Sequence, residues 1–186
     1  MSIATTPMTY DELLQMPDDG KRYEIIAGEL YVSASPGWYH QRVLARILVA
    51  ISRYLQDRGL PDTLFPAPFD IKLSDYDVVQ PDIVYIRPER VPVVRGERAP
   101  VEGFPDLAIE ILSRSTRAHD ERRKRALYAA FGVPEYWIVD IDARMIQVMI
   151  LFGDAYREMP DPELAPRSLV LPGLDLQPAY VFDGLD

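Results

Sequence analysis

The stretch Pro105–Lys124 reads PDLAIEILSRSTRAHDERRK, and it predicts a buried strand followed by a basic helix. Leu107–Leu112 is an apolar run too short for a helix in this setting, so we predict a strand there. Only Glu110 interrupts the run. A carboxylate inside a buried strand costs several kcal/mol unless a partner compensates its charge. Glu110 is therefore expected to have a partner.

The second half of this stretch is unusually basic for the chain. A turn at Ser113–Thr116 leads into a helix predicted over roughly Asp120–Phe131, which Gly132 closes. The segment Ser113–Arg125 contains six basic and two acidic residues, whereas the whole chain has a net charge of −9. A basic island thus directly follows a buried acid.

Composition restricts the classes of protein to which the chain can belong. With 186 residues and 48% hydrophobic composition, we predict one domain over 1–186, with a short N-terminal helix and a Pro-rich C-terminal arm. The absence of cysteine excludes disulfides and thiolate zinc sites. No apolar run approaches a membrane span, so a cytoplasmic protein is expected. The negative charge argues against DNA binding through overall charge, so such binding needs a local patch and a metal ion.

The elements on either side of the stretch indicate a mixed α/β fold. A long helix is predicted from Ser35–Pro36–Gly37 to about Arg58. The other predicted elements are a short helix at Tyr10–Gln15, two strand pieces within Tyr23–Val32, and strands at Leu64–Leu73, Val78–Ile86, Glu135–Asp140 and Ile146–Phe152. The central order of helix, three strands, helix and strand predicts an α/β sandwich with a mixed sheet. The five prolines from Pro160 to Pro178 predict an extended arm.

Two acids interrupt consecutive strands. Asp82 lies inside Val78–Ile86 as Glu110 lies inside Leu107–Leu112. If these strands pair, the two carboxylates come together, and their repulsion favours a cation between them. Hard oxygen ligands of this kind suit Mg²⁺ or Mn²⁺. The alternative is that each acid lies at a strand end, exposed or paired with an arginine.

The basic helix presents a lysine, and not an arginine, on its apolar face. At about 100° per residue, Lys124 falls on the same side as Tyr128, whereas Arg122 and Arg123 point away. A lysine in that position can extend its ammonium to solvent, pair with a carboxylate, or act as a positioned cation.

Three further polar residues have more than one interpretation. Glu24, in the first strand piece, can reach the same site, and Glu29 competes with it for that place. His40 begins the buried face of the long helix, where it is either a core histidine or a member of the site.

Several separate motifs together resemble one known family. YEIIAGELYV, His40 at a helix start, VVQPDIVYI, GFPDLAIEILSRST, the Asp120/Lys124/Tyr128 spacing and GVPEYWIVD occur in the order typical of the Uma-type restriction endonucleases. This family is part of the PD-(D/E)XK nuclease superfamily, and the resemblance covers roughly Thr9–Phe152. It implies a restriction-endonuclease-like αβββαβ core with a mixed central sheet flanked by helices.

The resemblance also implies roles for individual residues. Asp82 and Glu110, with the Ile111 carbonyl, would hold Mg²⁺ (or Mn²⁺), and Glu24 would be the upstream acid. The superfamily lysine belongs two residues after the second acid, where this chain has Leu112. Lys124 is expected to take over its role from the helix.

The activity implied is metal-dependent hydrolysis of DNA, with the phosphates contacted by Arg114, Arg117, Arg122 and Arg123. Cutting both strands favours a homodimer, with the C-terminal strands and the Pro-rich arm as its interface. One alternative is a nuclease-fold binding or scaffold protein without turnover, which the missing lysine and the chain's acidity favour. Another is a nuclease that acts on RNA or on DNA ends.

Overall fold

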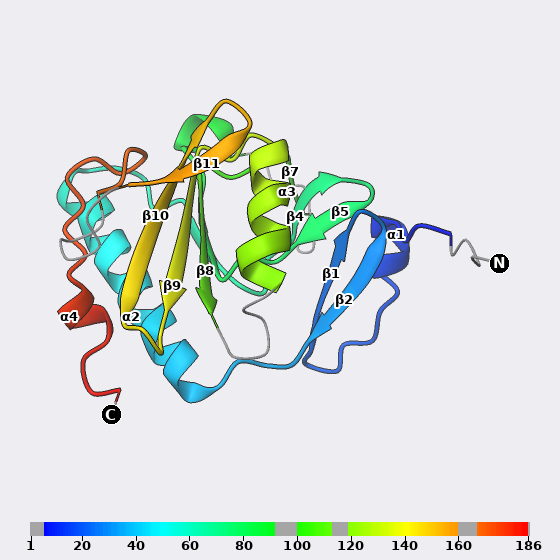
Figure 1. The fold of residues 1–186 in the computed structure, drawn as a ribbon, viewed down its shortest axis with the longest axis horizontal. Coiled ribbons are helices and arrows are strands. Elements are labelled where there is room, and N and C mark those ends of the chain that lie inside the picture. Colours follow the sequence, from blue (N-terminus) through cyan, green and yellow to red (C-terminus); the bar gives the residue numbers. More distant parts are fainter. Residues whose placement is uncertain (1–5, 92–99, 113–118, 160–166, 186) are drawn as a thin grey trace.

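In the computed structural model, which describes residues 6–91, 100–112, 119–159 and 167–185, the run Leu107–Leu112 lies at the centre of a six-stranded sheet (Figure 1). The strands of this sheet are β3 (Leu64–Pro66), β6 (Ile83–Tyr85), β8 (Leu107–Leu112), β9 (Glu135–Asp140), β10 (Met145–Phe152) and β11 (Ala155–Glu158). Their order is β11-β10-β9-β8-β6-β3. The central β8 and β9 are parallel, whereas β8 and β6 are antiparallel, so the sheet is mixed as predicted.

A second, five-stranded sheet has the order β2-β1-β5-β4-β7. It consists of β1 (Arg22–Ile26), β2 (Glu29–Ser33), β4 (Ile71–Ser74), β5 (Asp77–Val79) and β7 (Val101–Glu102). The first two strands form a hairpin around Gly28, which has a φ of +76°. A Cβ at Gly28 would lie 2.5 Å from the Cβ of Pro7, so this turn requires glycine.

Two of the predicted strands are wrong as single elements, because each is divided between the sheets. Val78–Ile86 forms the end of β5 and all of β6, and Leu64–Leu73 similarly gives β3 and most of β4. Pro81 has no N–H to donate to a strand ladder, so the strand predicted over Val78–Ile86 breaks there. Asp82 consequently lies where the chain crosses from one sheet to the other.

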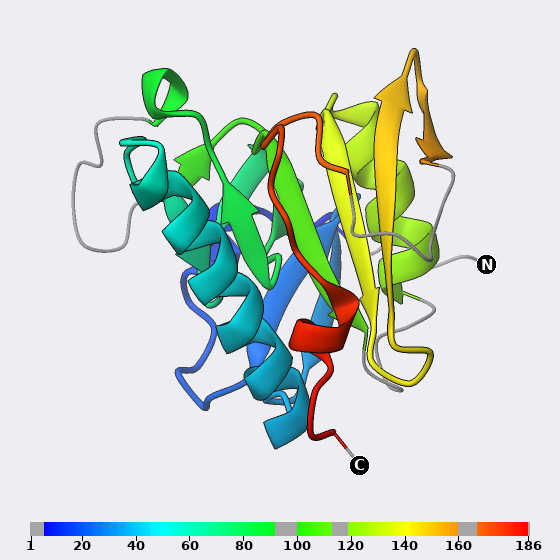
Figure 2. The same cartoon turned by 90° about the vertical axis from the view of Figure 1, so that its left-hand side faces the viewer.

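Helices cover both faces of the six-stranded sheet, as Figure 2 shows for α2 (Trp38–Asp57) and α3 (Arg125–Ala130). The odd-numbered residues of β8, such as Ile109, pack in a core with α2. The even-numbered Ala108 and Leu112 pack in a second core with Tyr128 of α3. Glu110 therefore faces the α3 side. Counting only the strands of the six-stranded sheet, the chain runs α2, β3, β6, β8, α3 and β9, which is the predicted order of helix, three strands, helix and strand.

The remaining helical segments are short. They are α1 (Tyr10–Leu13), η1 (Pro88–Arg90), a π-helical turn η2 (His119–Lys124) that leads directly into α3, and α4 (Pro178–Val181). The helix predicted over Asp120–Phe131 is therefore present, but its first turn is π-helical. Within the part of the chain that the structure describes, no helix is long and apolar enough to cross a membrane.

The C-terminal arm packs against α2 and the six-stranded sheet. Leu171, Leu174 and Leu176 belong to the same core as α2, and α4 adds Val181. Glu135 of β9 holds the start of this segment by accepting hydrogen bonds from the backbone N–H groups of Leu169 and Val170. Residues 167–177 contain bends and a turn and no regular element, and they are followed by a short helix that was not predicted.

Candidate active site

A buried lysine bridges two acids between the sheets. The Nζ of Lys124 lies 2.9 Å from Oε1 of Glu24 and 2.9 Å from Oε1 of Glu110. The exposed fraction of each of these three residues is 3% or less. Charges buried this deeply are tolerated only when they are paired, so each of them needs the others. The structure thus brings together three of the residues that the sequence placed in one site.

Tyr128 completes the surroundings of Glu110. One helical turn after Lys124, its hydroxyl donates a 2.7 Å hydrogen bond to the same Oε1. Burial, and then the charges of Glu110 and Glu24, raise the pKa of Tyr128 well above its ordinary value, so the hydroxyl stays a donor. No role for Tyr128 was predicted, although its four-residue spacing from Lys124 was a usable signal.

Glu24 is fixed from the opposite side by the crossing between the sheets. Its Oε1 also accepts a 2.7 Å hydrogen bond from the backbone N–H of Gln80. The Gln80 side chain in turn donates to Asp70, whose pKa is raised, chiefly by burial. Glu24 thus contacts both the five-stranded sheet to which it belongs and the helix that carries Lys124.

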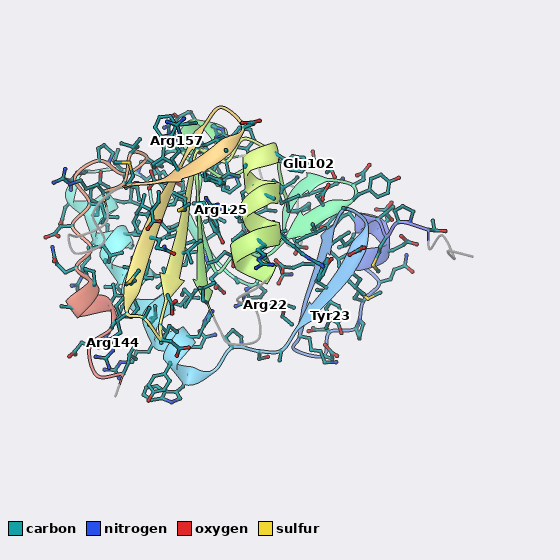
Figure 3. All side chains as sticks on the ribbon, in the orientation of Figure 1. Arg22, Tyr23, Glu102, Arg125, Arg144 and Arg157 are labelled. Atoms are coloured by element: carbon teal, nitrogen blue, oxygen red, sulfur yellow. The ribbon has the colours of Figure 1, made fainter. Side chains whose placement is uncertain are left out.

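Asp82 is held by a second group of partners. Its Oδ1 accepts a 2.6 Å hydrogen bond from Arg22. Its Oδ2 accepts a 2.8 Å bond from the backbone N–H of Ile111 and lies 3.0 Å from Nε2 of His40. Figure 3 shows Arg22 between the β1–β2 hairpin and the six-stranded sheet. The sequence did not place Arg22 in the site, and it left the role of His40 open.

These partners keep Asp82 ionised. Burial alone would raise the pKa of this carboxyl, but the hydrogen bond and charge of His40, the Arg22 guanidinium and the Ile111 N–H outweigh it. The net result is a pKa lowered to about 2. Asp82 is therefore an anion throughout the physiological pH range.

The end of β6 leaves an open position beside β8. Ile83, the first residue of β6, pairs with Ile109, so this strand does not extend to Ile111. The Ile111 N–H donates its hydrogen bond to the Asp82 side chain instead. Because the N–H and C=O of one strand residue point to the same edge, the Ile111 carbonyl also faces this position. Asp82 and the residue after Glu110 therefore meet here.

The donor atoms at this junction are oxygens, the type of ligand that suits a hard divalent cation. Buried carboxylates and a strand carbonyl are the oxygen ligands that Mg²⁺ and Mn²⁺ take. Among the described residues, however, no three Asp, Glu or His side chains form a ready-made metal cluster. Arg22 and Lys124 occupy carboxylate oxygens that a metal would use. The residues fit such an ion, provided that it displaces a protein cation.

The position at which the resemblance leads us to expect the superfamily lysine is part of the core. Leu112 is buried and packs in the same core as Tyr128. A lysine at this position would replace apolar packing with a charge. Lys124 approaches Glu110 from the helix instead, at hydrogen-bonding distance.

The predicted phosphate-contacting arginines are only partly described. Arg122 and Arg123 are exposed beside the buried Lys124, and Arg123 lies over the Tyr31 ring at 4.8 Å from its centroid. Glu29, the competitor of Glu24, is on the surface near Arg123 and outside the buried cluster. Arg114 and Arg117 lie outside the described residues.

Comparison with known proteins agrees with this fold. Residues 10–179 match the family model described as "Uma2: Putative restriction endonuclease". The structure is similar to a crystal structure of "a putative nuclease belonging to DUF820" from Anabaena variabilis ATCC 29413. The TM-score is 0.75 at 22% sequence identity, with 95% of this chain and 98% of that chain covered. No curated protein matches the sequence. At this identity, the structural likeness establishes a shared fold.

Proposed function

This chain belongs to the Uma2 family, and from that membership we propose that it is a metal-dependent endonuclease that hydrolyses DNA phosphodiester bonds. The observation that carries the proposal is the buried bridge of Glu24, Lys124 and Glu110 next to Asp82. Buried, paired charges at the junction of two sheets need a reason, and perturbed titratable groups cluster at functional sites.

Asp82, Glu110 and the Ile111 carbonyl are the ligands that we propose for Mg²⁺ or Mn²⁺. When bound, such an ion would polarise a phosphate and lower the pKa of a water molecule. The low pKa of Asp82 supports this assignment, because a metal ligand must be deprotonated. Arg22 then serves as the cation that compensates Asp82 when no metal is bound.

Lys124 is the proposed catalytic cation. Its ammonium stabilises charge that develops on the phosphate oxygens, or orients the attacking water. Glu24 and Glu110 fix its position through two 2.9 Å contacts, and Tyr128 fixes Glu110. A preorganised cation of this kind needs no rearrangement during the reaction, which is why its position matters for the rate.

DNA is the proposed partner, and exposed arginines are its proposed phosphate contacts. Arg122 and Arg123 adjoin Lys124 in sequence and lie on the surface. Arg114 and Arg117 precede them on the basic segment. Such contacts give affinity that depends strongly on salt and carries little sequence information.

We also propose a homodimer, because two sites related by a twofold axis can cut both strands of a duplex. The expected interface needs revision, since the arm residues Leu171 and Leu174 are buried within their own chain. Leu30 and Val32 on the edge strand β2 are exposed apolar residues that suit such a contact better. Light scattering that reports a monomer at micromolar concentration would contradict the homodimer.

A nuclease-fold protein that binds nucleic acid without turnover remains the second candidate. Two observations favour it: Leu112 replaces the superfamily lysine, and the three buried acids already have cationic side chains as partners. Both candidates predict DNA binding, so only turnover separates them.

Plasmid cleavage tests the choice between these functions. With Mg²⁺ or Mn²⁺, the parent protein should nick or linearise supercoiled DNA, and EDTA should stop it. Asp82→Asn and Glu110→Gln should each abolish cleavage, whereas Glu158→Gln, a change on the exposed side of β11, should not. An RNA of matched sequence identifies the preferred nucleic acid. If the parent binds DNA but never cuts, the binding function replaces the nuclease.

A further inference from the structure

Two adjacent aromatic side chains are exposed in the first turn of α2. Trp38 has an exposed fraction of 60% and Tyr39 of 36%. Their rings stack on each other with centroids 4.2 Å apart and an interplanar angle of 28°. A stacked pair of this kind holds a flat aromatic face toward solvent, which an isolated surface tryptophan does not do.

The charge around this pair favours an anionic ligand. From Leu30 to Gln56 the sequence has no Asp or Glu, although the chain has 29 of them. The first turn of α2 contains no acidic residue, and its N-cap is Gly37, without a side-chain cap. The partial positive charge at the start of this 20-residue helix is therefore not compensated by its own side chains. Arg42, one turn later, is exposed and adds a formal charge.

The same helical turn belongs to the candidate site. His40, whose Nε2 lies 3.0 Å from Asp82, follows Trp38 by two residues. Two residues on a helix are rotated by about 200°, so the side chains of Trp38 and His40 point in nearly opposite directions, and Trp38 lies outside the buried cluster. In Figure 1, α2 begins at the lower edge of the molecule, below the lower end of α3.

We propose that Trp38 and Tyr39 form a stacking platform for an unpaired base of the DNA strand that lies in the site. Aromatic side chains bind the π-faces of bases with little sequence preference. In a duplex both faces of an internal base are covered by its neighbours, so the platform selects strands with an unpaired base near the cut. An overhang, a gap or a locally opened duplex provides one. This inference rests on the proposed function and specifies its substrate.

Nucleic acid fits this surface better than a protein partner. An aromatic pair for protein contact is normally the centre of an apolar patch. Here its exposed neighbours in the turn are Gln41 and Arg42. Aromatic rings beside basic and polar groups, next to a site built for a phosphate, are the combination found in single-strand binding grooves.

Intrinsic fluorescence tests the platform directly. The chain has two tryptophans, and the other one, Trp137, has an exposed fraction of 0%. Titration with a single-stranded oligothymidylate in EDTA should quench the fluorescence of the parent protein, because the base stacks on Trp38. A blunt duplex of matched length should quench it much less. Because no metal is present, the result does not depend on whether the protein cleaves DNA.

Substitutions complete the test. Trp38→Leu should remove the quenching and weaken oligothymidylate binding, measured by anisotropy, roughly tenfold, with little effect on the blunt duplex. Trp38→Phe should restore most of the affinity. Tyr76→Leu, a change at an exposed aromatic in the turn between β4 and β5, should alter neither.

Two results would overturn the platform. One is equal binding of oligothymidylate by the parent and Trp38→Leu. The other combines two measurements: oligothymidylate does not change the fluorescence of the parent protein, and light scattering gives a lower molecular mass for Trp38→Leu than for the parent. This combination would assign the surface to contact with a second copy of this chain. Absence of cleavage together with intact quenching would instead reject the nuclease and keep the platform.

Discussion

Lys124 is almost completely buried and pairs with two carboxylates, which makes it unlike the surface lysine Lys21. Lys124→Met should leave Glu24 and Glu110 buried without their shared cation. Breaking a buried ion pair in this way costs about 3 kcal/mol of unfolding free energy or more. Urea unfolding in EDTA would measure the loss. In single-turnover cleavage the rate should fall about 10²-fold, the effect of losing one preorganised donor.

Two matched variants separate these effects for Lys124. Arg122→Ala, at an exposed position two residues earlier, should leave the unfolding free energy nearly unchanged and weaken only DNA binding. Lys124→Arg keeps the charge but should not restore the rate, because the planar guanidinium does not fit the place of an ammonium. A Lys124→Met protein that is as stable and as fast as the parent would disprove the role of the bridge.

Asp82 should make the protein sensitive to acid. Its pKa is lowered to about 2 in the folded state, from about 3.9 in an unfolded chain. Its ionisation therefore stabilises the fold fully above roughly pH 5, and this stabilisation is lost as the pH falls toward 2. The loss is on the order of 2 kcal/mol. Unfolding free energies of the parent and Asp82→Asn across this range should converge as the pH falls, and parallel curves would exclude Asp82 as the source.

Some site residues could be predicted from the sequence and others could not. Glu110 interrupts a buried strand and Lys124 lies on an apolar helix face, so each is conspicuous within its own element. Arg22 and His40 reach Asp82 from 60 and 42 residues away along the chain. Nothing in their local sequence indicates that contact, because it arises only when β1 and α2 pack around the crossing of the two sheets.

At the scale of elements, periodicity identified strands but not the sheets to which they belong. VVQPDIVYI is apolar apart from Gln80 and Asp82, and its apolar residues in β5 and β6 are all buried, so the pattern is the same on either side of the break. Pro81 was the signal that the strand divides. The strands Glu135–Asp140 and Ile146–Phe152 contain no proline and were predicted to within one residue.

Glu135 should couple the C-terminal arm to the sheet. This fully buried carboxylate accepts hydrogen bonds from the Trp137 indole and from the backbone N–H groups of Leu169 and Val170. Glu135→Ala leaves three donors without their acceptor, which should lower the unfolding free energy by at least about 2 kcal/mol. Hydrogen exchange measured by mass spectrometry should accelerate in the peptide that contains Leu169 and Val170.

Glu158 provides the comparison for Glu135. It is exposed on β11 and accepts from Gln147, so Glu158→Ala should change neither the unfolding free energy nor the exchange of the arm. If the amide hydrogens of the arm exchanged as slowly in the Glu135→Ala variant as in the Glu158→Ala variant, we would conclude that the buried leucines alone hold the arm.

At the scale of the whole molecule, the candidate site lies where the two sheets meet. Glu24 and Arg22 come from the five-stranded sheet, Glu110 comes from the six-stranded sheet, and Lys124 joins them from η2. Three carboxylates face two permanent cations here, so the group keeps one formal negative charge when His40 is neutral. A divalent cation that displaced one of the two protein cations would bring this charge to zero and tie both sheets to one point.

Metal binding should therefore stabilise the folded protein as a whole. An ion that binds only the native state adds about 2.7 kcal/mol at 100 times its Kd. For a chain of this size that corresponds to a rise in Tm of roughly 5–10 °C. Differential scanning calorimetry in Mg²⁺, with EDTA and NaCl at matched ionic strength as the reference, would measure it. The double variant Asp82→Asn, Glu110→Gln should lose the rise, and an equal rise in that variant or none in the parent would reject the proposed metal site.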